Sequence, residues 1–322
     1  MHANGSKGAD KAPLQAKRKR FAKRESVKCL VSTRKGTLKP QETIEVVLGG
    51  GAVRGLGLIG LLQALEEHNV ATSTFTGVSI GSLVATLYTN GYTPEQITEI
   101  FLKEIKQISS RSMITALIIP FGRGQLDLRG VFAKIIKKYK LKPQKNLRIV
   151  AYSVLKRQPV VFEGTDYDLL TALSASCAIP FLMRPVWYGQ KGLIGQLLNL
   201  VPFLGDDRDL LVDGGIYHPA PAEFSKGRVI IGKLGLATQL PRHSVSISEL
   251  FLQACEMVGS LFLDYIFPDP EGHIIVPVAM PDVGALSFGL PRKKGLEMVK
   301  YGYAVAMHEL AAAIKCGEVP VK

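Results

Sequence analysis

The fold is decided by residues 43–90, which read TIEVVLGGGAVRGLGLIGLLQALEEHNVATSTFTGVSIGSLVATLYTN. Ile44–Leu48 is a short apolar run of the kind that forms a buried strand, and Leu56–Glu67 carries apolar residues at helical spacing. A second strand is expected around Ser73–Thr76, and a second helix over Ile80–Asn90. Two successive strand–turn–helix units predict an α/β protein.

The rest of the chain continues this alternation. Further strands are expected at Leu147–Val154, Val160–Phe162, Leu210–Val212, Arg228–Leu234 and His273–Val278. Further helices are expected at Pro94–Lys106, Arg129–Tyr139, Asp166–Cys177, Ser246–Tyr265 and Lys294–Lys315. The pattern predicts a mostly parallel sheet covered on both faces, within one domain over residues 43–322.

The positive charge is concentrated at one end of the sequence. The 322 residues carry 40 Lys and Arg against 27 Asp and Glu, and 47% are hydrophobic, which excludes wholesale disorder, coiled coil and collagen. Residues 1–39 alone hold twelve bases and two acids, a net charge of +10, which leaves +3 for the remainder. We therefore expect residues 1–42 to form a basic, disordered arm.

Several classes of protein are disfavoured. There is no run of about 18 apolar residues to span a membrane, and the start lacks the apolar segment of a secretory signal. We therefore expect a soluble, cytoplasmic chain that could bind a membrane peripherally. The cysteines lie far apart, as expected for reduced thiols, and no metal site is predicted; they are Cys29, Cys177, Cys255 and Cys316.

Ser79 lies between Gly77 and Gly81 in the sequence GVSIG, where the second strand meets its helix. This pattern is typical of a nucleophile elbow, a sharp turn whose glycines avoid clashes and whose serine hydroxyl projects above the sheet. The dipole of the following helix favours negative charge developing there. The alternative is an ordinary turn serine that caps the helix.

A glycine-rich loop, LGGGAVRG at Leu48–Gly55, follows the first strand. A dinucleotide site would require an acid at the end of the second strand, where Thr74 and Thr76 stand. A P-loop would require Gly-Lys-Ser/Thr. The third interpretation is an oxyanion hole, whose amides stabilise the tetrahedral anion of an ester by roughly 3 kcal/mol per donor.

Asp213 follows the strand Leu210–Val212 and begins the sequence Asp-Gly-Gly. A serine hydrolase commonly uses a histidine as its base, and His218 is the best candidate in the sequence. An aspartate is a poor base at its ordinary pKa of about 3.9, and it would have to be partly desolvated to act on Ser79. A plain tight turn is the alternative for Asp-Gly-Gly.

In this order, the three motifs resemble those of the patatin-like phospholipase family of lipid acyl hydrolases. Two further segments are similar to that family, and the likeness covers about residues 44–315. These segments are Ser174–Pro180 (SASCAIP) and Leu286–Phe288 followed by the helix that contains Tyr301–Tyr303. The resemblance implies a three-layer α/β/α domain with a mostly parallel central sheet and a serine nucleophile elbow.

The resemblance also implies roles for site residues. Ser79 would be the nucleophile and Asp213 its base, without a histidine and without a metal or organic cofactor. The oxyanion hole would involve Gly50, Gly51, Ala52 and Arg54, and the motif glycines would be Gly49, Gly55, Gly77, Gly81, Gly214 and Gly215. One departure is Ala52, which stands where the family pattern has its central glycine.

The expected activity is calcium-independent hydrolysis of carboxylic esters in phospholipids or lysophospholipids. The alternatives are an acyltransferase or thioesterase that forms the same acyl-enzyme, and a lipid-binding module without turnover. The segment 187–204 is long and apolar, so a loop there would border the active site and contact lipid. The apolar segment 113–121 could contact lipid in the same way. The arm could bind anionic lipid, whereas nucleic acid is not expected because Phe21 is its one aromatic residue.

Overall fold

The computed structural model describes residues 43–105, 126–180, 182–189, 208–234, 272–280, 282–284 and 290–322. All of them belong to the unit Gln41–Lys322. Several predicted features lie outside the described residues: the arm, residues 113–121, most of residues 187–204 and the helix Ser246–Tyr265.

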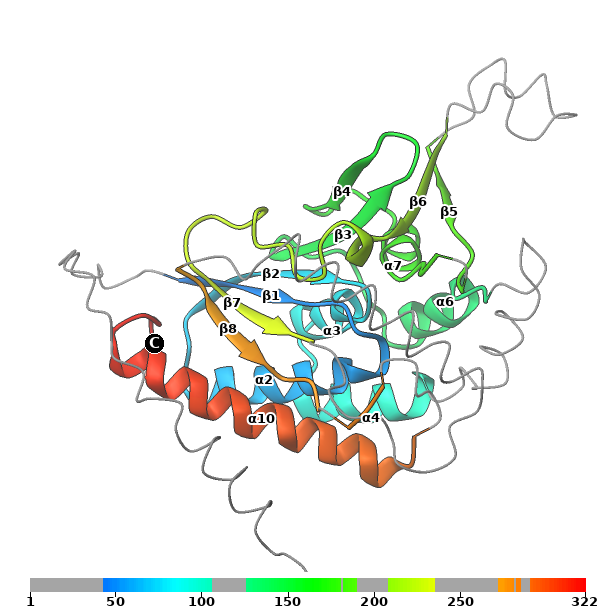
Figure 1. Cartoon of the computed structure of the whole chain (residues 1–322). Coiled ribbons are helices and arrows are strands. Elements are labelled where there is room, and N and C mark those ends of the chain that lie inside the picture. Colours follow the sequence, from blue (N-terminus) through cyan, green and yellow to red (C-terminus); the bar gives the residue numbers. More distant parts are fainter. Residues whose placement is uncertain are drawn as a thin grey trace, which may run out of the picture. The chain divides into compact units, whose positions relative to one another are not determined.

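An eight-stranded sheet forms the centre of this unit (Figure 1). Its strands are β1 (Ile44–Leu48), β2 (Thr72–Val78), β3 (Leu147–Ser153), β4 (Gln158–Phe162), β5 (Val186–Tyr188), β6 (Asp209–Asp213), β7 (Val229–Lys233) and β8 (Ile274–Pro277). The spatial order is β5-β6-β3-β2-β1-β7-β8, and β4 pairs with β3. Strands β3, β2, β1, β7 and β8 pair in parallel, which confirms the predicted α/β fold.

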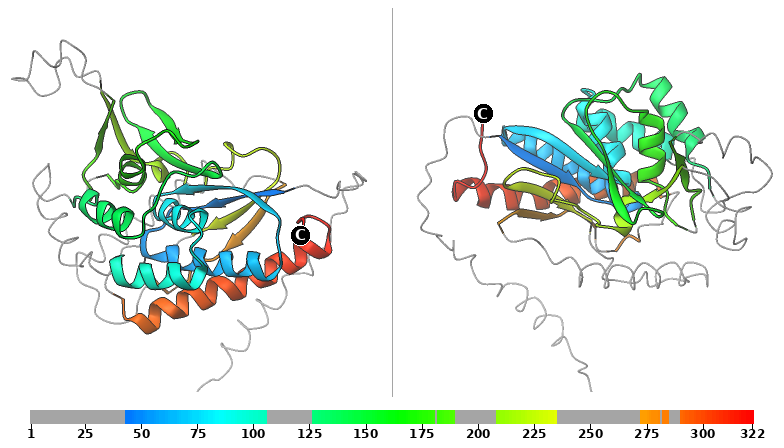
Figure 2. Two further views of the ribbon diagram at one scale, coloured as in Figure 1. Left: turned by 180° about the vertical axis from the view of Figure 1, so that it is seen from behind. Right: turned by 90° about the horizontal axis from the view of Figure 1, so that it is seen from above.

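Helices pack against the sheet through one large hydrophobic core (Figure 2). They are α2 (Leu56–Glu67), α3 (Ile80–Thr89), α4 (Pro94–Glu104), α6 (Arg129–Lys138), α7 (Leu169–Ser176) and α10 (Arg292–Lys315), with the short 3-10 helices η1 (Ala52–Gly55) and η3 (Gly214–Ile216). The chain steps in one direction from β1 to β2 to β3. Because such crossovers are right-handed, α2 and α3 lie on the same face of the sheet.

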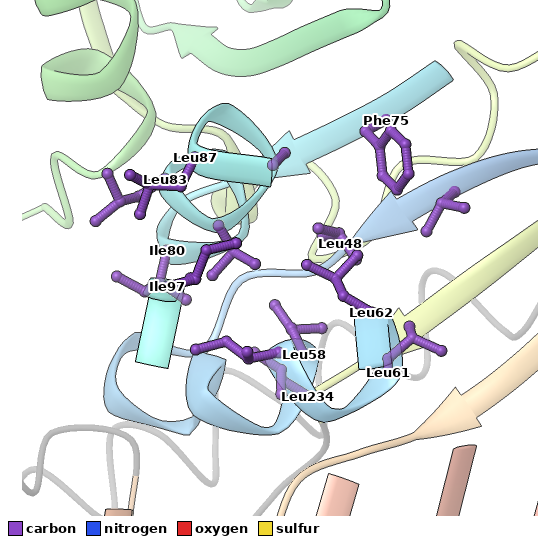
Figure 3. Close-up of a cluster of buried hydrophobic side chains, with 14 of the residues drawn as sticks. Leu48, Leu58, Leu61, Leu62, Phe75, Ile80, Leu83, Leu87, Ile97 and Leu234 are labelled. Atoms are coloured by element: carbon purple, nitrogen blue, oxygen red, sulfur yellow. The ribbon is translucent and has the colours of Figure 1, made fainter. Parts of the chain in front are cut away.

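The core is built from side chains of the sheet and of these helices (Figure 3). Leu48 and Phe75 of the sheet belong to the same cluster as Leu58 and Leu62 of α2 and Leu83 of α3. Burying each such side chain contributes about 1.5–3 kcal/mol. This packing fixes the ends of β1 and β2, from which the two glycine-containing turns emerge.

A smaller cluster lies on the opposite face. Val47 of β1 and Ile231 of β7 pack there against Ala220 and Ala222, which belong to the segment that follows η3. This segment therefore runs over β1 and β7, and it brings the backbone of Pro219 to the glycine-rich loop.

Helices α2 and α10 approach each other through glycines. A Cβ atom at Gly60 would lie 2.3 Å from the backbone of both Val299 and Tyr303, and one at Gly302 would lie 2.2 Å from the oxygen of Gly57. The two backbones are therefore in direct contact, which holds α2 rigidly behind the turn that precedes it.

Two details of the sheet differ from the sequence-based expectation. Trp187 and Tyr188 were expected in a loop, but they belong to strand β5, which pairs antiparallel with β6. In addition, β4 and β6 both run antiparallel to β3. The antiparallel direction of β6 matters for the site, because it brings the carboxyl end of β6 beside Ala151 in β3.

Candidate active site

Ser79 occupies a sharp turn between β2 and α3, with φ 52° and ψ −127°. A residue with a side chain adopts this conformation at a cost of about 1–3 kcal/mol. The flanking glycines are sterically required, because a Cβ atom at Gly77 would lie 2.4 Å from Cα of Ser82 and one at Gly81 would lie 2.1 Å from the oxygen of Leu48. The turn thus has the geometry expected of a nucleophile elbow.

Hydrogen bonds hold the backbone of Ser79 on both sides. Its N–H donates to Oγ of Ser176 at 2.9 Å, and the Ser176 hydroxyl donates to the oxygen of Val150 at 2.7 Å. Its carbonyl oxygen accepts from both the N–H and the hydroxyl of Ser82, at 2.9 and 2.5 Å. These bonds fix the strained residue in place.

Ser176 is a supporting residue to which the sequence alone assigned no role. It lies in the segment Ser174–Pro180, which resembles the family as a block. That block was the available signal, although nothing local in it identifies which serine reaches the elbow.

The structure brings Asp213 to Ser79. Asp213 ends β6 beside Ala151, where its carboxyl lies close enough to the Ser79 side chain for Ser79 to influence its pKa. Its Oδ1 also accepts the N–H of Gly215 at 2.7 Å. Gly214 allows this turn to pass close to β3, because a Cβ atom there would lie 2.5 Å from the oxygen of Val150.

The environment of Asp213 changes its acidity. Burial raises the pKa of its carboxyl to about 6, and the hydrogen bonds from Ser79 and Gly215 partly oppose this rise. Burial and the neighbouring Asp213 also raise the pKa of the Cys177 thiol. Cys177 is therefore a neutral thiol next to the Ser79–Asp213 pair.

His218 is the histidine that the sequence offered as a possible base, and its environment in the structure is not the one expected of such a base. Its Nδ1 accepts the N–H of Ala220 at 3.2 Å, and burial lowers the pKa of its imidazole. The Ser79 side chain influences the pKa of the Asp213 carboxyl.

The glycine-rich loop lies directly beside Ser79. A Cβ atom at Gly50 would lie 3.2 Å from Cβ of Ser79. The N–H of Gly49 donates to the oxygen of Gly232 at 3.1 Å, and that of Gly50 donates to the oxygen of Pro219 at 2.9 Å. The Gly50 amide is therefore already engaged in this conformation.

Ala52 and Arg54 complete the loop. Ala52 has φ 47°, in the left-handed region that favours glycine, at the position where the family pattern has one. The N–H of Arg54 donates to the oxygen of Gly51 at 3.1 Å, and Arg54 is buried in η1. Gly55 abuts the residue after Ser79, since a Cβ atom there would lie 2.7 Å from Cγ2 of Ile80.

A cavity of about 300 Å³ lies near this site, between α7, the start of α6 and β5. Ser174 and Cys177 line its wall. The next residue, Ala178, supports Asp213, because its carbonyl oxygen accepts the N–H of Asp213. The volume is at the lower end of small-molecule sites. Within the described ranges, no group of three or more His, Cys, Asp or Glu side chains could hold a metal ion.

The fold and the site define an α/β protein with a serine nucleophile elbow and a buried aspartate. Residues 46–224 match the family model of Patatin-like phospholipase. The chain therefore belongs to the patatin-like phospholipase family. The matched range contains Ser79, Asp213 and the glycine-rich loop.

The individual proteins that resemble this chain either have low sequence identity to it or match only a short part of it. The chain is 27% identical over 212 residues to the probable lipid hydrolase 463L of Invertebrate iridescent virus 6, covering 59% of this chain and 65% of the viral one. It is 49% identical over 51 residues to the lysophospholipase NTE1 of Candida glabrata, covering 16% of this chain and 3% of the fungal one. The uncharacterized protein YqhO of Bacillus subtilis is 23% identical over 298 residues, 80% of this chain and 95% of that protein.

Among solved structures, VipD from Legionella pneumophila is similar with a TM-score of 0.48 and 14% identity, covering 84% of this chain and 67% of VipD. As for the membrane, no helix in the described part of the chain is both long enough and apolar enough to cross one.

Proposed function

We propose that this protein hydrolyses carboxylic ester bonds of phospholipids or lysophospholipids through an acyl-Ser79 intermediate. The approach of the buried Asp213 carboxyl to Ser79, which sits on a strained turn at the end of β2, carries the proposal. Family membership and the relatives named as a lipid hydrolase and a lysophospholipase support the substrate class.

In the first half of the reaction, Asp213 takes the proton of the Ser79 hydroxyl while Oγ attacks the carbonyl carbon of the ester. The resulting tetrahedral oxyanion is stabilised by the amides of Gly51 and Ala52, which follow the engaged amide of Gly50. The ester C–O bond then breaks, and the alcohol leaves with the proton from Asp213.

In the second half, Asp213 removes a proton from water, whose oxygen attacks the acyl-Ser79 carbonyl. The acyl–Oγ bond breaks, Ser79 recovers its proton, and the fatty acid is released. A carboxyl with a pKa of about 6 is ionised at neutral pH and is a stronger base than an exposed aspartate.

The test is release of fatty acid from mixed phospholipid and lysophospholipid vesicles in the presence of a chelator of divalent cations. The native chain should be active, and Ser79→Ala and Asp213→Asn should lose at least about a thousandfold in rate. Ser73→Ala, on the strand β2 that leads to Ser79, is the matched control and should remain active. Equal rates for the native chain and Ser79→Ala would contradict the proposal.

Two further measurements separate the alternatives. If acyl chains pass to an added alcohol or lysolipid in preference to water, the protein is an acyltransferase with the same acyl-enzyme. If a fluorophosphonate probe fails to label Ser79 in the native chain, the protein is a lipid-binding module without turnover.

A further inference from the structure

The exposed large hydrophobic side chains of the described residues are distributed unevenly over the fold. They are Val154, Leu155, Tyr188, Ile216 and Val321. Val321 pairs with Val70, which precedes β2, so it lies at the end of the sheet opposite Ser79. The other four lie at or beyond the edge where β2 ends at Ser79.

The strand register shows how far they extend. Ala151 of β3 lies opposite Asp213, whereas Ser153 lies two residues further along, opposite Leu211. At about 3.3 Å per residue, β3 therefore extends about 7 Å past Asp213 before it turns into β4. Leu155, in that turn, is 57% exposed.

Strands β5 and β6 extend past Asp213 as far as the β3–β4 turn does. The N–H of Val154 donates to the oxygen of Leu210, and Tyr188 lies opposite Asp209. Figures 1 and 2 show the β3–β4 turn beside the end of β5 and the start of β6. We call the turn Val154–Arg157 together with Trp187, Tyr188 and Arg208 the hairpin rim.

The basic side chains of the hairpin rim are Lys156, Arg157 and Arg208, and the adjoining Asp209 offsets the charge of Lys156. Lys156 lies 3.5 Å from the buried Asp209 carboxylate, and Arg157 follows it in the turn. The Arg208 guanidinium lies 5.0 Å from the centroid of the Trp187 ring. Aliphatic tips, aromatic rings and basic groups together are typical of protein surfaces that enter the interface of an anionic bilayer.

We propose that the hairpin rim docks onto the surface of an anionic phospholipid bilayer and so turns the Ser79 edge of the sheet toward the lipid. The choice of a bilayer as the substrate-bearing surface rests on the proposed function. The basic residues Arg157 and Arg208 complement anionic headgroups, and Val154 and Leu155 are both exposed in one turn, as suits insertion between lipids.

The docking can be measured without turnover, in full-length Ser79→Ala protein. Trp187 is the one tryptophan of the chain, so its fluorescence reports on the hairpin rim alone. We expect a blue shift of its emission on adding phosphatidylserine-containing vesicles, and quenching by brominated lipids. An unchanged spectrum while the protein co-sediments with the vesicles would overturn the proposal.

Substitutions give the second readout. Leu155→Asp should weaken partition onto phosphatidylserine vesicles by about tenfold or more. Val321→Asp, at a residue 51% exposed on the opposite edge, should leave partition unchanged. Equal partition of these two variants would overturn the proposal, and would leave the hairpin rim as a surface for another protein.

A third arm separates this inference from the proposed function. With Ser79 restored, Leu155→Asp should retain hydrolysis of a soluble short-chain ester while its hydrolysis of vesicle lipid falls. Vesicle binding through the hairpin rim without any ester hydrolysis would refute the proposed function and leave the docking intact. Equal hydrolysis of vesicle lipid by Leu155→Asp and Val321→Asp would refute the docking and leave the proposed function intact.

Discussion

Ser79 combines a nucleophilic hydroxyl with an unfavourable backbone conformation, at φ 52° and ψ −127°. Glycine adopts such angles more readily than alanine. We therefore expect Ser79→Gly to exceed Ser79→Ala in free energy of unfolding by about 1–2 kcal/mol, while both variants are inactive. Urea unfolding of the two variants tests this, and an alanine variant as stable as the glycine variant would refute strain at Ser79.

The acidity of Asp213 predicts the pH dependence of activity. Its carboxyl must be ionised to accept the Ser79 proton, and its pKa is raised to about 6. The value of kcat/KM on a soluble ester should therefore fall about tenfold per pH unit below pH 6 and level off above pH 7. Constant kcat/KM down to pH 4 would argue against Asp213 as the base.

The same raised pKa predicts a stability effect of the opposite sense to that of a salt-bridged aspartate. The folded state holds the Asp213 proton more tightly than the unfolded state, whose pKa is near 3.8. The stability associated with protonation is complete below about pH 4 and is lost as the pH rises through 6.

Asp213→Asn removes this titration. Its free energy of unfolding should therefore exceed that of the native chain at pH 8 by up to about 3 kcal/mol, with the gain vanishing towards pH 4. Denaturant unfolding at the two pH values measures the gain. Asp282→Asn, at an exposed aspartate, is the control, and a pH-independent gain for Asp213→Asn would be inconsistent with the raised pKa.

At the residue scale, the motifs predicted which groups meet but not every bond between them. The pairing of Ser79 with Asp213 followed from the resemblance to the family, and the structure brings the two together. That the Gly50 amide is occupied by Pro219 could not be predicted. This contact depends on a segment that crosses the opposite face of the sheet, and no local pattern near Gly50 reports it.

The contact between α2 and α10 provides a prediction at the element scale. Gly60→Ala would place a methyl group 2.3 Å from the backbone of α10, and backbone atoms cannot rotate away. We expect a loss of about 2–4 kcal/mol in free energy of unfolding. Gly130→Ala in α6 is the control.

Gly130 has no atom within 4 Å of the added methyl group, and alanine favours the helix. That variant should therefore gain about 0.5–1 kcal/mol. A similar loss in both variants would mean that backbone entropy or helix propensity, and not the close approach, determines the effect at Gly60.

The direction and number of strands could be predicted only in part. Buried runs such as Ile44–Leu48 were identifiable by their composition, and β1 agrees with the expected bounds. Trp187 and Tyr188 of the three-residue strand β5 were assigned to a loop, because a strand so short has no measurable alternation. The antiparallel direction of β6 depends on its pairing with β3, which local sequence does not encode.

At the scale of the whole molecule, charge and apolar exposure belong to different parts of the chain. Residues 1–39 carry a net charge of +10, whereas the exposed Leu155 lies in the unit Gln41–Lys322. Electrostatic attraction to anionic lipid weakens with salt, while burial of apolar side chains does not. The two proposed contributions to membrane binding can therefore be separated by ionic strength.

Deletion of residues 1–39 should weaken binding to phosphatidylserine vesicles at low salt and flatten its dependence on salt, because each basic residue near an anionic surface contributes about 1 kcal/mol. Hydrolysis of a soluble ester should be unchanged. Leu155→Ala, which removes apolar area without adding a charge, should instead lower binding by a similar factor at every salt concentration. If the deletion leaves the salt dependence of vesicle binding intact, the basic residues of the arm do not contact lipid, and the hairpin rim must supply the electrostatic part of the binding as well.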